Sequence, residues 1–207
     1  CHVAEIPEES GFLQNGDDSL EELLKERSAW DPKWKPPGKS PIEYLNSLNI
    51  LESLLAIHCN FIAADLDVMA LKKVSAVFCP KSTHWFGRKD FMPVRTLLDR
   101  GIGVALGTDS LASNDSLNFL QELRMADKLL PDVSRKEILT MATLGGAEAL
   151  GLQCGKLACG QKADLIGFRI SPPYSGSWSD IPFESHRQEV DFYMLDGRPT
   201  TFLPSNS

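Results

Sequence analysis

Histidine and acidic side chains near expected strand ends are the residues of this chain that fit hydrolytic chemistry. His2 and Glu5 form a His-x-x-Glu pair at the start of the chain. His58 and Asp109 each close an apolar run further along. Imidazole and carboxylate groups are natural ligands for zinc or ferrous iron, and a nearby Glu can move a proton to or from metal-activated water. One interpretation of the pattern is therefore a metal site for hydrolysis.

Each of these residues also has an ordinary structural interpretation. An exposed Glu beside a loop is common, so the His2–Glu5 pair alone is a weak signal. A histidine next to a cysteine at a strand end, such as His58, is more often a core or rim residue. Asp109 needs partners after an apolar strand, and backbone amides of the next loop would satisfy it as well as a metal. The residues alone leave both interpretations open.

The remaining histidines are weaker candidates. His84 lies between Thr83 and Trp85, shortly after Ser82. It either contacts a substrate or packs under an aromatic lid, and we favour substrate contact. His186 lies near the C-terminus, where we expect a structural or exposed role.

A series of strands and helices is expected to position these side chains. Short apolar runs predict buried strands at residues 54–58, 75–79 and 103–106, and the first residues are interpreted as the end of another strand followed by a loop. Helices are predicted at residues 19–30, 40–48, 65–73, 91–100, 116–130, 135–143 and 146–150. The strand runs are continuous rather than alternating, which predicts a parallel sheet covered by helices on its outer face. In a β/α barrel, catalytic residues gather at the C-terminal ends of such strands.

The character of the chain changes at about residue 151. Residues 164–170 and 189–195 alternate between polar and apolar, and Asp196-Gly197 is a turn signal between strands. Residues 171–179 are rich in Pro, Gly and Ser. We therefore expect a partial β/α barrel over residues 1–150 and a small β-rich appendage over residues 151–207.

Composition excludes several classes of protein. The net charge is −7 and no run of Lys and Arg forms a stripe, so nucleic acid is not an expected partner. No apolar stretch is long enough to cross a bilayer and no signal peptide is visible, so no membrane partner is expected. Five scattered cysteines favour a reducing, cytoplasmic setting over a disulfide framework. The chain starts with Cys1 rather than Met, which suggests a fragment.

Several short motifs follow one another in a set order over nearly the whole chain. They are His2-x-x-Glu5, Ile57-His58-Cys59-Asn60, Cys79-Pro80-Lys81-Ser82, Leu106-Gly107-Thr108-Asp109-Ser110 with Ala112-Ser113-Asn114, and Gly155-Lys156-Leu157 to Ala163-Asp164-Leu165. This ordered set resembles the amidohydrolase superfamily, in the branch of methylthioadenosine and S-adenosylhomocysteine deaminases, guanine deaminases and triazine hydrolases. The resemblance implies an α/β fold: the C-terminal half, strands five to eight, of a TIM-type (β/α)8 barrel. Residues 151–207 would then be the C-terminal part of a small composite β-sandwich.

The resemblance also implies roles for individual residues. His2 and Asp109 would bind one divalent metal, with zinc expected before iron. Glu5 would be the acid/base residue, His58 would polarise the substrate, and Asp109 would also accept a proton from water. Substrate contacts are expected from three residues, Ser82, His84 and Asn114.

This sequence departs from the family pattern in one large respect. The first-strand His-x-His, which supplies two further ligands, is absent, and so are strands one to four. Two protein ligands make an incomplete site, because a catalytic zinc usually has at least three. We expect weak or no metal binding by the chain alone, and association as a homodimer or with the missing N-terminal half.

The expected reaction of the parent protein is hydrolytic deamination of an amino-substituted nitrogen heterocycle. The alternatives are hydrolytic dehalogenation of a triazine-type ring and a non-catalytic interaction module. Both Glu5 and Asp109 are present, which favours an enzyme. For the isolated chain, inactivity is the expectation.

Overall fold

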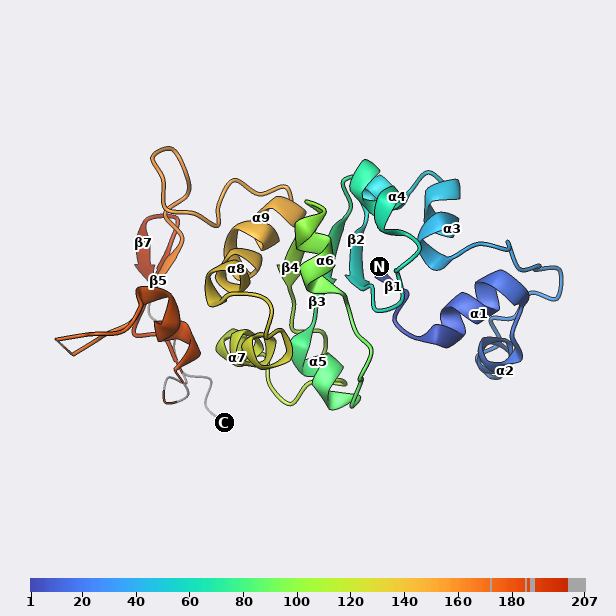
Figure 1. Cartoon of the computed structure of the whole chain (residues 1–207), viewed down its shortest axis with the longest axis horizontal. Coiled ribbons are helices and arrows are strands. Elements are labelled where there is room, and N and C mark those ends of the chain that lie inside the picture. Colours follow the sequence, from blue (N-terminus) through green and yellow to red (C-terminus); the bar gives the residue numbers. More distant parts are fainter. Residues whose placement is uncertain (172, 185, 187–188, 201–207) are drawn as a thin grey trace. The chain divides into compact units, whose positions relative to one another are not determined.

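A computed structural model describes residues 1–171, 173–184, 186 and 189–200 of the chain (Figure 1). The chain divides into two compact units. The first unit combines residues 1–79 with residues 86–104, and the second combines residues 80–85 with the described residues from 105 onward. None of the helices in these residues is long and apolar enough to cross a membrane.

A sheet of short strands forms the centre of the first unit. They are β1 (His2–Val3), β2 (Leu55–His58), β3 (Ser75–Phe78) and the first residues of β4 (Gly103–Leu106), hydrogen-bonded in the order β1-β2-β3-β4. β1 and β2 are parallel with Val3 opposite His58, and β2 and β3 are parallel with Leu55 opposite Ser75. The predicted parallel sheet in sequence order is confirmed for these pairs. The C-terminal ends of β1 and β2 therefore lie at one edge.

Apart from α1, the helices of the first unit lie on predicted segments, with shorter bounds. They are α1 (Pro7–Asn15), α2 (Asp18–Glu26), α3 (Pro41–Ser47), α4 (Leu66–Leu71) and α6 (Val94–Asp99), with a short 3-10 turn η1 (Leu51–Ser53). The capping box that opens α3 is formed, because Ser40 Oγ accepts the Glu43 N–H at 3.1 Å. The same hydroxyl donates to Asp65 Oδ1 at 2.5 Å. Asp65 occupies the N-cap position of α4, at the predicted start of this helix, but makes no side-chain cap bond.

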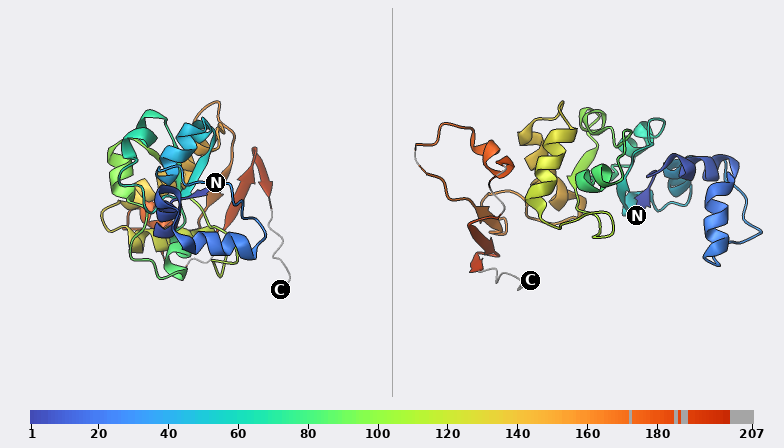
Figure 2. Two further views of the ribbon diagram at one scale, coloured as in Figure 1. Left: turned by 90° about the vertical axis from the view of Figure 1, so that its right-hand side faces the viewer. Right: turned by 90° about the horizontal axis from the view of Figure 1, so that it is seen from below.

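The loop predicted after residue 5 was wrong, because α1 begins at Pro7. The signals were visible in the sequence: Pro in the first turn, acidic Glu8 and Glu9 beside it, and Gly16 at the C-cap with φ of 80°. Helix α2 also ends at Glu26, earlier than predicted. Figure 2 shows α1 and α2 packed together as a pair.

The second unit contains the remaining helices. They are α5 (Pro80–Trp85), α7 (Phe119–Leu129), α8 (Arg135–Thr140) and α9 (Gly146–Ala149), with a π-helical segment η2 (Met141–Gly145) joining the last two. Three of them lie on predicted helices. Helix α5 was not predicted, although Pro80 at its start is a residue favoured in the first turn of a helix.

Antiparallel strands form a small sheet in the second unit. They are β5 (Leu165–Gly167), β6 (Phe192–Leu195) and β7 (Arg198–Thr200), in the order β5-β6-β7. Asp196 and Gly197, with φ of 50° and 75°, form the predicted turn. The segment before the sheet contains a 3-10 turn, η3 (Trp178–Phe183). The domain boundary at residue 151 stays a prediction, and residues 201–207 lie outside the described part.

Candidate functional site

The backbone of Glu5 is held on both sides by side chains of the first unit. Its N–H donates to Glu9 Oε2 at 3.1 Å. Its carbonyl oxygen accepts from Asn60 Nδ2 at 3.0 Å and from Arg88 Nη1 at 3.2 Å. Ala4, between Glu5 and β1, has φ of 50°, which is uncommon for a residue with a Cβ. Left-handed residues of this kind are typical of functional sites, because surrounding contacts must stabilise them.

The Glu9 carboxyl group stabilises this turn. Burial raises the pKa of Glu9, and hydrogen bonds from the Ala4 and Glu5 backbones lower it in part. The two amides that follow β1 therefore converge on one carboxylate. This contact fixes the direction in which Glu5 leaves the strand.

Two histidines and Glu5 come together at the ends of β1 and β2. The ring centroids of His2 and His58 are 5.1 Å apart. His58 Nε2 lies 3.8 Å from Glu5 Oε1, and the His58 side chain is only 3% exposed. His58 also has a left-handed backbone, with φ of 73°. The first unit thus unites three of the residues that the sequence singled out for chemistry.

Cys59 follows His58 and is fully buried. Burial raises the pKa of its thiol to about 12, with smaller contributions from the charges of Glu9 and Asp65. A thiol is a good nucleophile only as the thiolate. Cys59 is therefore a core residue and a poor candidate for a nucleophile.

Asp109 lies three residues after β4, in the second unit, and is held by two hydroxyl groups. Its Oδ2 accepts from Ser82 Oγ at 2.8 Å and from Ser113 Oγ at 2.6 Å. Its φ is 58°, so it too has the left-handed backbone found at the ends of β1 and β2. Ser82 comes from α5 and Ser113 from the loop after β4. Two segments therefore orient this carboxylate.

A buried acid on α7 connects the same two segments. Glu122 is fully buried. Its Oε1 accepts from Asn114 Nδ2 at 2.6 Å, and its Oε2 accepts the Lys81 N–H at 3.0 Å. Asn114 is 2% exposed and also donates to the Thr108 carbonyl at 2.8 Å. Glu122 thus connects α7 to the loop that follows Asp109, through Asn114, and to the start of α5, through Lys81.

Replacing Glu122 by alanine is expected to destabilise the protein by about 2–4 kcal/mol, because the Asn114 amide and the Lys81 N–H lose their acceptor and a cavity opens. Glutamine should cost less, since one of the two contacts survives. Urea unfolding followed by circular dichroism would measure both. Glu148 is an exposed acid on α9, so Glu148→Ala is the matched control and should change little. An equally small effect of Glu122→Ala would contradict the assigned contacts.

The Glu122 pKa also gives the sign of a pH dependence. Burial raises this pKa above its ordinary value of 4.5, and the charge of Asp109 raises it further, while hydrogen bonds from Lys81 and Asn114 act in the opposite direction. The folded protein then binds a proton at Glu122 more tightly than the unfolded chain does. This contribution to stability is complete below the ordinary value and is lost as the pH rises through the raised value. Glu122→Gln should lack it.

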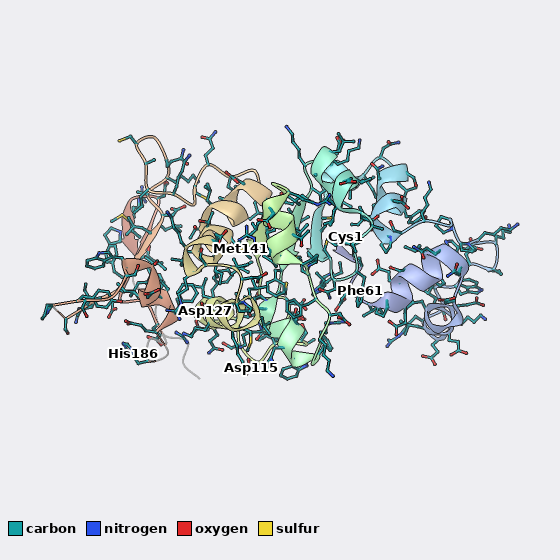
Figure 3. All side chains as sticks on the ribbon, in the orientation of Figure 1. Cys1, Phe61, Asp115, Asp127, Met141 and His186 are labelled. Carbon is teal, nitrogen blue, oxygen red and sulfur yellow. The ribbon has the colours of Figure 1, made fainter. Side chains whose placement is uncertain are left out.

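The other candidate residues differ in their surroundings. His84 is exposed on α5, so it does not pack under an aromatic lid. His186 has a 72% exposed side chain and lies 3.5 Å from Glu184 Oε2 (Figure 3). The exposed or structural role expected for His186 agrees with this position.

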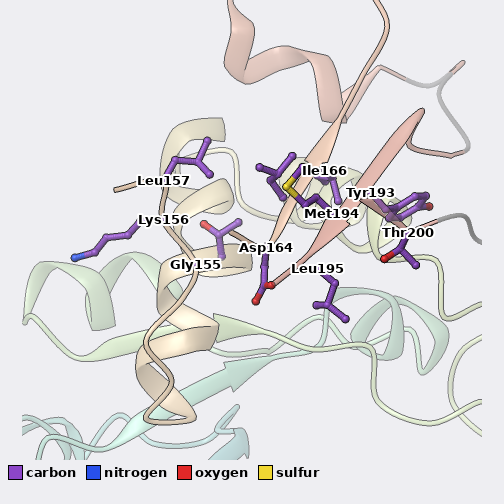
Figure 4. Close-up of a pocket in the computed structure, with 11 residues that line it drawn as sticks. Gly155, Lys156, Leu157, Asp164, Ile166, Tyr193, Met194, Leu195 and Thr200 are labelled. Carbon is purple, nitrogen blue, oxygen red and sulfur yellow. The ribbon is translucent and has the colours of Figure 1, made fainter. Parts of the chain in front are cut away.

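A pocket of about 560 Å³ lies against the small sheet of the second unit (Figure 4). Its lining is mainly apolar, with Leu157, Ile166 and Met194 among the side chains. Its one acid, Asp164, accepts the Asp196 N–H at 2.7 Å and so holds the β6–β7 turn. The pocket lacks the histidines and paired acids that hydrolysis needs, so we do not assign the chemistry to it.

Sequence reasoning missed several residues that position the candidates, namely Glu9, Asn60, Arg88, Ser113 and Glu122. One of them had a visible signal. Glu122 and Ala126 on α7 and Leu130 at its C-cap are spaced four residues apart, so an acid stands in an otherwise apolar stripe. A charge in such a stripe indicates a buried partner. The contacts of Asn60 and Arg88 join residues far apart in the sequence, and no local pattern predicts them.

Comparison with known proteins identifies the family. The family model described as "Amidohydrolase family" matches residues 37–200. The 5'-deoxyadenosine deaminase of Methanothermobacter thermautotrophicus is 33% identical over 174 residues, which cover 78% of this chain and 40% of that protein. The 5-methylthioadenosine/S-adenosylhomocysteine deaminase of Pyrococcus horikoshii is 33% identical over 78% of this chain and 41% of its own length.

A solved structure is also similar. The crystal structure of an adenosine deaminase from Xanthomonas campestris with bound zinc has a TM-score of 0.76 and 26% identity, over 96% of this chain and 44% of that one. The chain spans about 40% of the length of the curated relatives that it matches. The family match covers far more than half of the chain, and the chain belongs to the amidohydrolase family.

Proposed function

We propose that this chain is the C-terminal half of a TIM-type barrel in a metal-dependent hydrolytic deaminase. Three findings support the proposal: a parallel sheet in sequence order, family membership, and coverage of about 40% of the matched relatives. Strands β1 to β4 would be the last four of the barrel. The substrate would be an amino-substituted nitrogen heterocycle, because the two curated relatives described above are deaminases of adenosine-like compounds.

The observation that carries the proposal is the arrangement at the ends of β1 and β2. Glu5 lies 3.8 Å from His58 at the strand edge where barrel enzymes hold their catalytic groups. A carboxylate next to an imidazole can pass a proton to a ring nitrogen and then to the leaving amine. In this role Glu5 is the acid/base residue and His58 polarises the bound ring.

His2 and Asp109 are the proposed metal ligands. An imidazole and a carboxylate fit zinc, and the zinc in the Xanthomonas relative supports that metal over iron. When bound, the metal would supply activated water near neutral pH. The hydroxyls of Ser82 and Ser113 would hold the Asp109 carboxylate in the required direction, as partners of ligating carboxylates commonly do. Further ligands would come from the N-terminal half.

Ser82, His84 and Asn114 remain proposed substrate-binding residues. His84 has the exposure that contact with a small molecule needs. Asn114 is buried, and its amide donates hydrogen bonds to Glu122 and to the Thr108 carbonyl. Asn114 would therefore influence substrate binding indirectly, by positioning the loop that carries Asp109.

Ammonia release by the full-length protein tests the proposed function. The substrate panel would contain 5'-deoxyadenosine, methylthioadenosine, S-adenosylhomocysteine, guanine, a pterin and a chlorinated triazine. We expect ammonia from at least one amino heterocycle, loss of that activity after chelation, and its return with zinc. Chloride release without ammonia would overturn the deaminase assignment in favour of dehalogenation.

The 207-residue chain alone is the control for the missing half. It should release no ammonia and should bind zinc weakly in a calorimetric titration, because two ligands do not complete a catalytic site. Size measurements in solution would then report whether the chain associates with a second copy. Tight one-to-one zinc binding by the isolated chain would contradict the proposed division of the site.

A further inference from the structure

We propose that Arg88 is the residue that positions the acid/base carboxylate of Glu5. This inference rests on the proposed function. Arg88 lies 83 residues after Glu5, in the segment between α5 and α6, and both residues belong to the first unit.

The contact between the two residues has two parts. Arg88 Nη2 donates to Glu5 Oε1 at 2.7 Å, and Arg88 Nη1 donates to the Glu5 carbonyl oxygen at 3.2 Å. One planar guanidinium therefore donates hydrogen bonds to both the side chain and the backbone of the same residue. The fixed fork of an arginine gives such a pair directional order that a lysine ammonium lacks.

The surroundings strengthen this pair. The Arg88 side chain is 17% exposed and that of Glu5 is 26% exposed. A charge pair that is mostly shielded from water is screened less than a surface pair. The Arg88 guanidinium carbon also lies 5.0 Å from the centre of the Phe86 ring, which holds the plane of the fork from one side.

Other residues already fix the backbone of Glu5, so the Arg88 guanidinium acts mainly on the Glu5 side chain. Glu9 holds the Glu5 N–H, and Asn60 shares the Glu5 carbonyl with Arg88. Asn60 in turn accepts the Met92 N–H at 3.0 Å, which ties the segment after Arg88 to the same place. Only the side-chain torsions of Glu5 remain free to change. The hydrogen bond from Arg88 Nη2 to Glu5 Oε1 selects the rotamer in which the carboxylate faces His58.

Positioning of this kind predicts a particular kinetic signature. Replacing Arg88 by glutamine should lower kcat of the full-length protein by about 10- to 100-fold, because a misplaced catalytic group loses its near-attack geometry. KM and the zinc content should stay near the wild-type values, since Arg88 is proposed to contact neither the substrate nor the metal. Arg88→Lys should recover part of the loss. Arg95, which pairs with Asp99 one helical turn away on α6, is the matched control, and Arg95→Gln should leave kcat unchanged.

A double-mutant cycle makes the test decisive. If Arg88 acts through Glu5, Arg88→Gln should have almost no further effect in a Glu5→Gln background. Wild-type kcat in Arg88→Gln, a rise in KM alone, or an equal loss in both backgrounds would each overturn the inference. Thermal melts of each variant show whether the fold is intact, and Arg88→Lys provides the readout if the glutamine variant unfolds.

The two proposals fail in different ways. A wild-type protein that releases no ammonia, or a Glu5→Gln variant that remains fully active, removes the proposed function and this inference with it. An active wild type and an inactive Glu5→Gln variant, together with a normal Arg88→Gln variant, remove only the role of Arg88.

Discussion

Replacing Glu5 by glutamine is expected to lower kcat of the full-length protein by about 10²- to 10⁴-fold, the usual contribution of a positioned acid/base group. Glutamine has nearly the same shape, and its carbonyl oxygen can still accept the bond from Arg88 Nη2. It cannot take up and release a proton. The loss should therefore fall on turnover, with KM, zinc content and melting temperature close to those of the wild type.

The matched control for this change is Glu8→Gln. Glu8 stands three residues later in the first turn of α1 and is exposed. Its replacement removes the same charge from the same region and should leave the rate unchanged. Steady-state ammonia release would measure both variants. A Glu5→Gln rate within about 3-fold of the wild type would mean that Glu5 does not transfer the proton.

Replacing Asp109 by asparagine is the second change with a large expected effect. A neutral amide is a much poorer zinc ligand than a carboxylate, so the full-length variant should retain little zinc. Its kcat/KM should fall by at least about 100-fold, because the metal-activated water is lost with the metal. Elemental analysis of the purified protein gives zinc per chain, and the ammonia assay gives the rate.

Asp132→Asn is the control for this experiment. Asp132 lies in the exposed connection between α7 and α8. Its replacement makes the same chemical change in the same unit without touching Ser82 or Ser113. Zinc content and rate should both remain at the wild-type level. Full zinc occupancy in Asp109→Asn would show that the metal is held by other residues.

The strand pattern of this chain could be predicted from sequence because its signals are local. The apolar runs at residues 54–58 and 103–106 coincide with β2 and β4, and the Asp196–Gly197 turn lies where it was predicted. Continuous apolar runs bounded by turn residues need no information from distant parts of the chain. The same reasoning located Ser40 as the start of a helix.

Two helices were missed for a shared reason. Both α1 and α5 begin with a proline shortly after a strand, and neither proline was interpreted as the start of a helix. Proline removes one backbone donor, which the first turn of a helix does not use. The position of Ser82 depends on α5, so this error also hid how Ser82 reaches Asp109.

The residue types at the site were predictable, but the contacts that orient them were not. His2, Glu5, His58 and Asp109 stand out through residue type, strand end and order along the chain. Arg88 has no such signal, because its contact with Glu5 joins two residues that are 83 positions apart in the sequence. The left-handed backbones of Ala4, His58 and Asp109 are likewise properties of the folded chain.

The most direct test of the proposed site is an anomalous difference map at the zinc edge, measured on crystals of the full-length protein. The account predicts one strong peak bonded to a His2 nitrogen and an Asp109 oxygen, at the usual zinc distances of about 2.0–2.2 Å. Glu5 should lie beside the peak without binding it. A peak that His2 and Asp109 do not contact, or a zinc-free protein that still releases ammonia, would contradict the account.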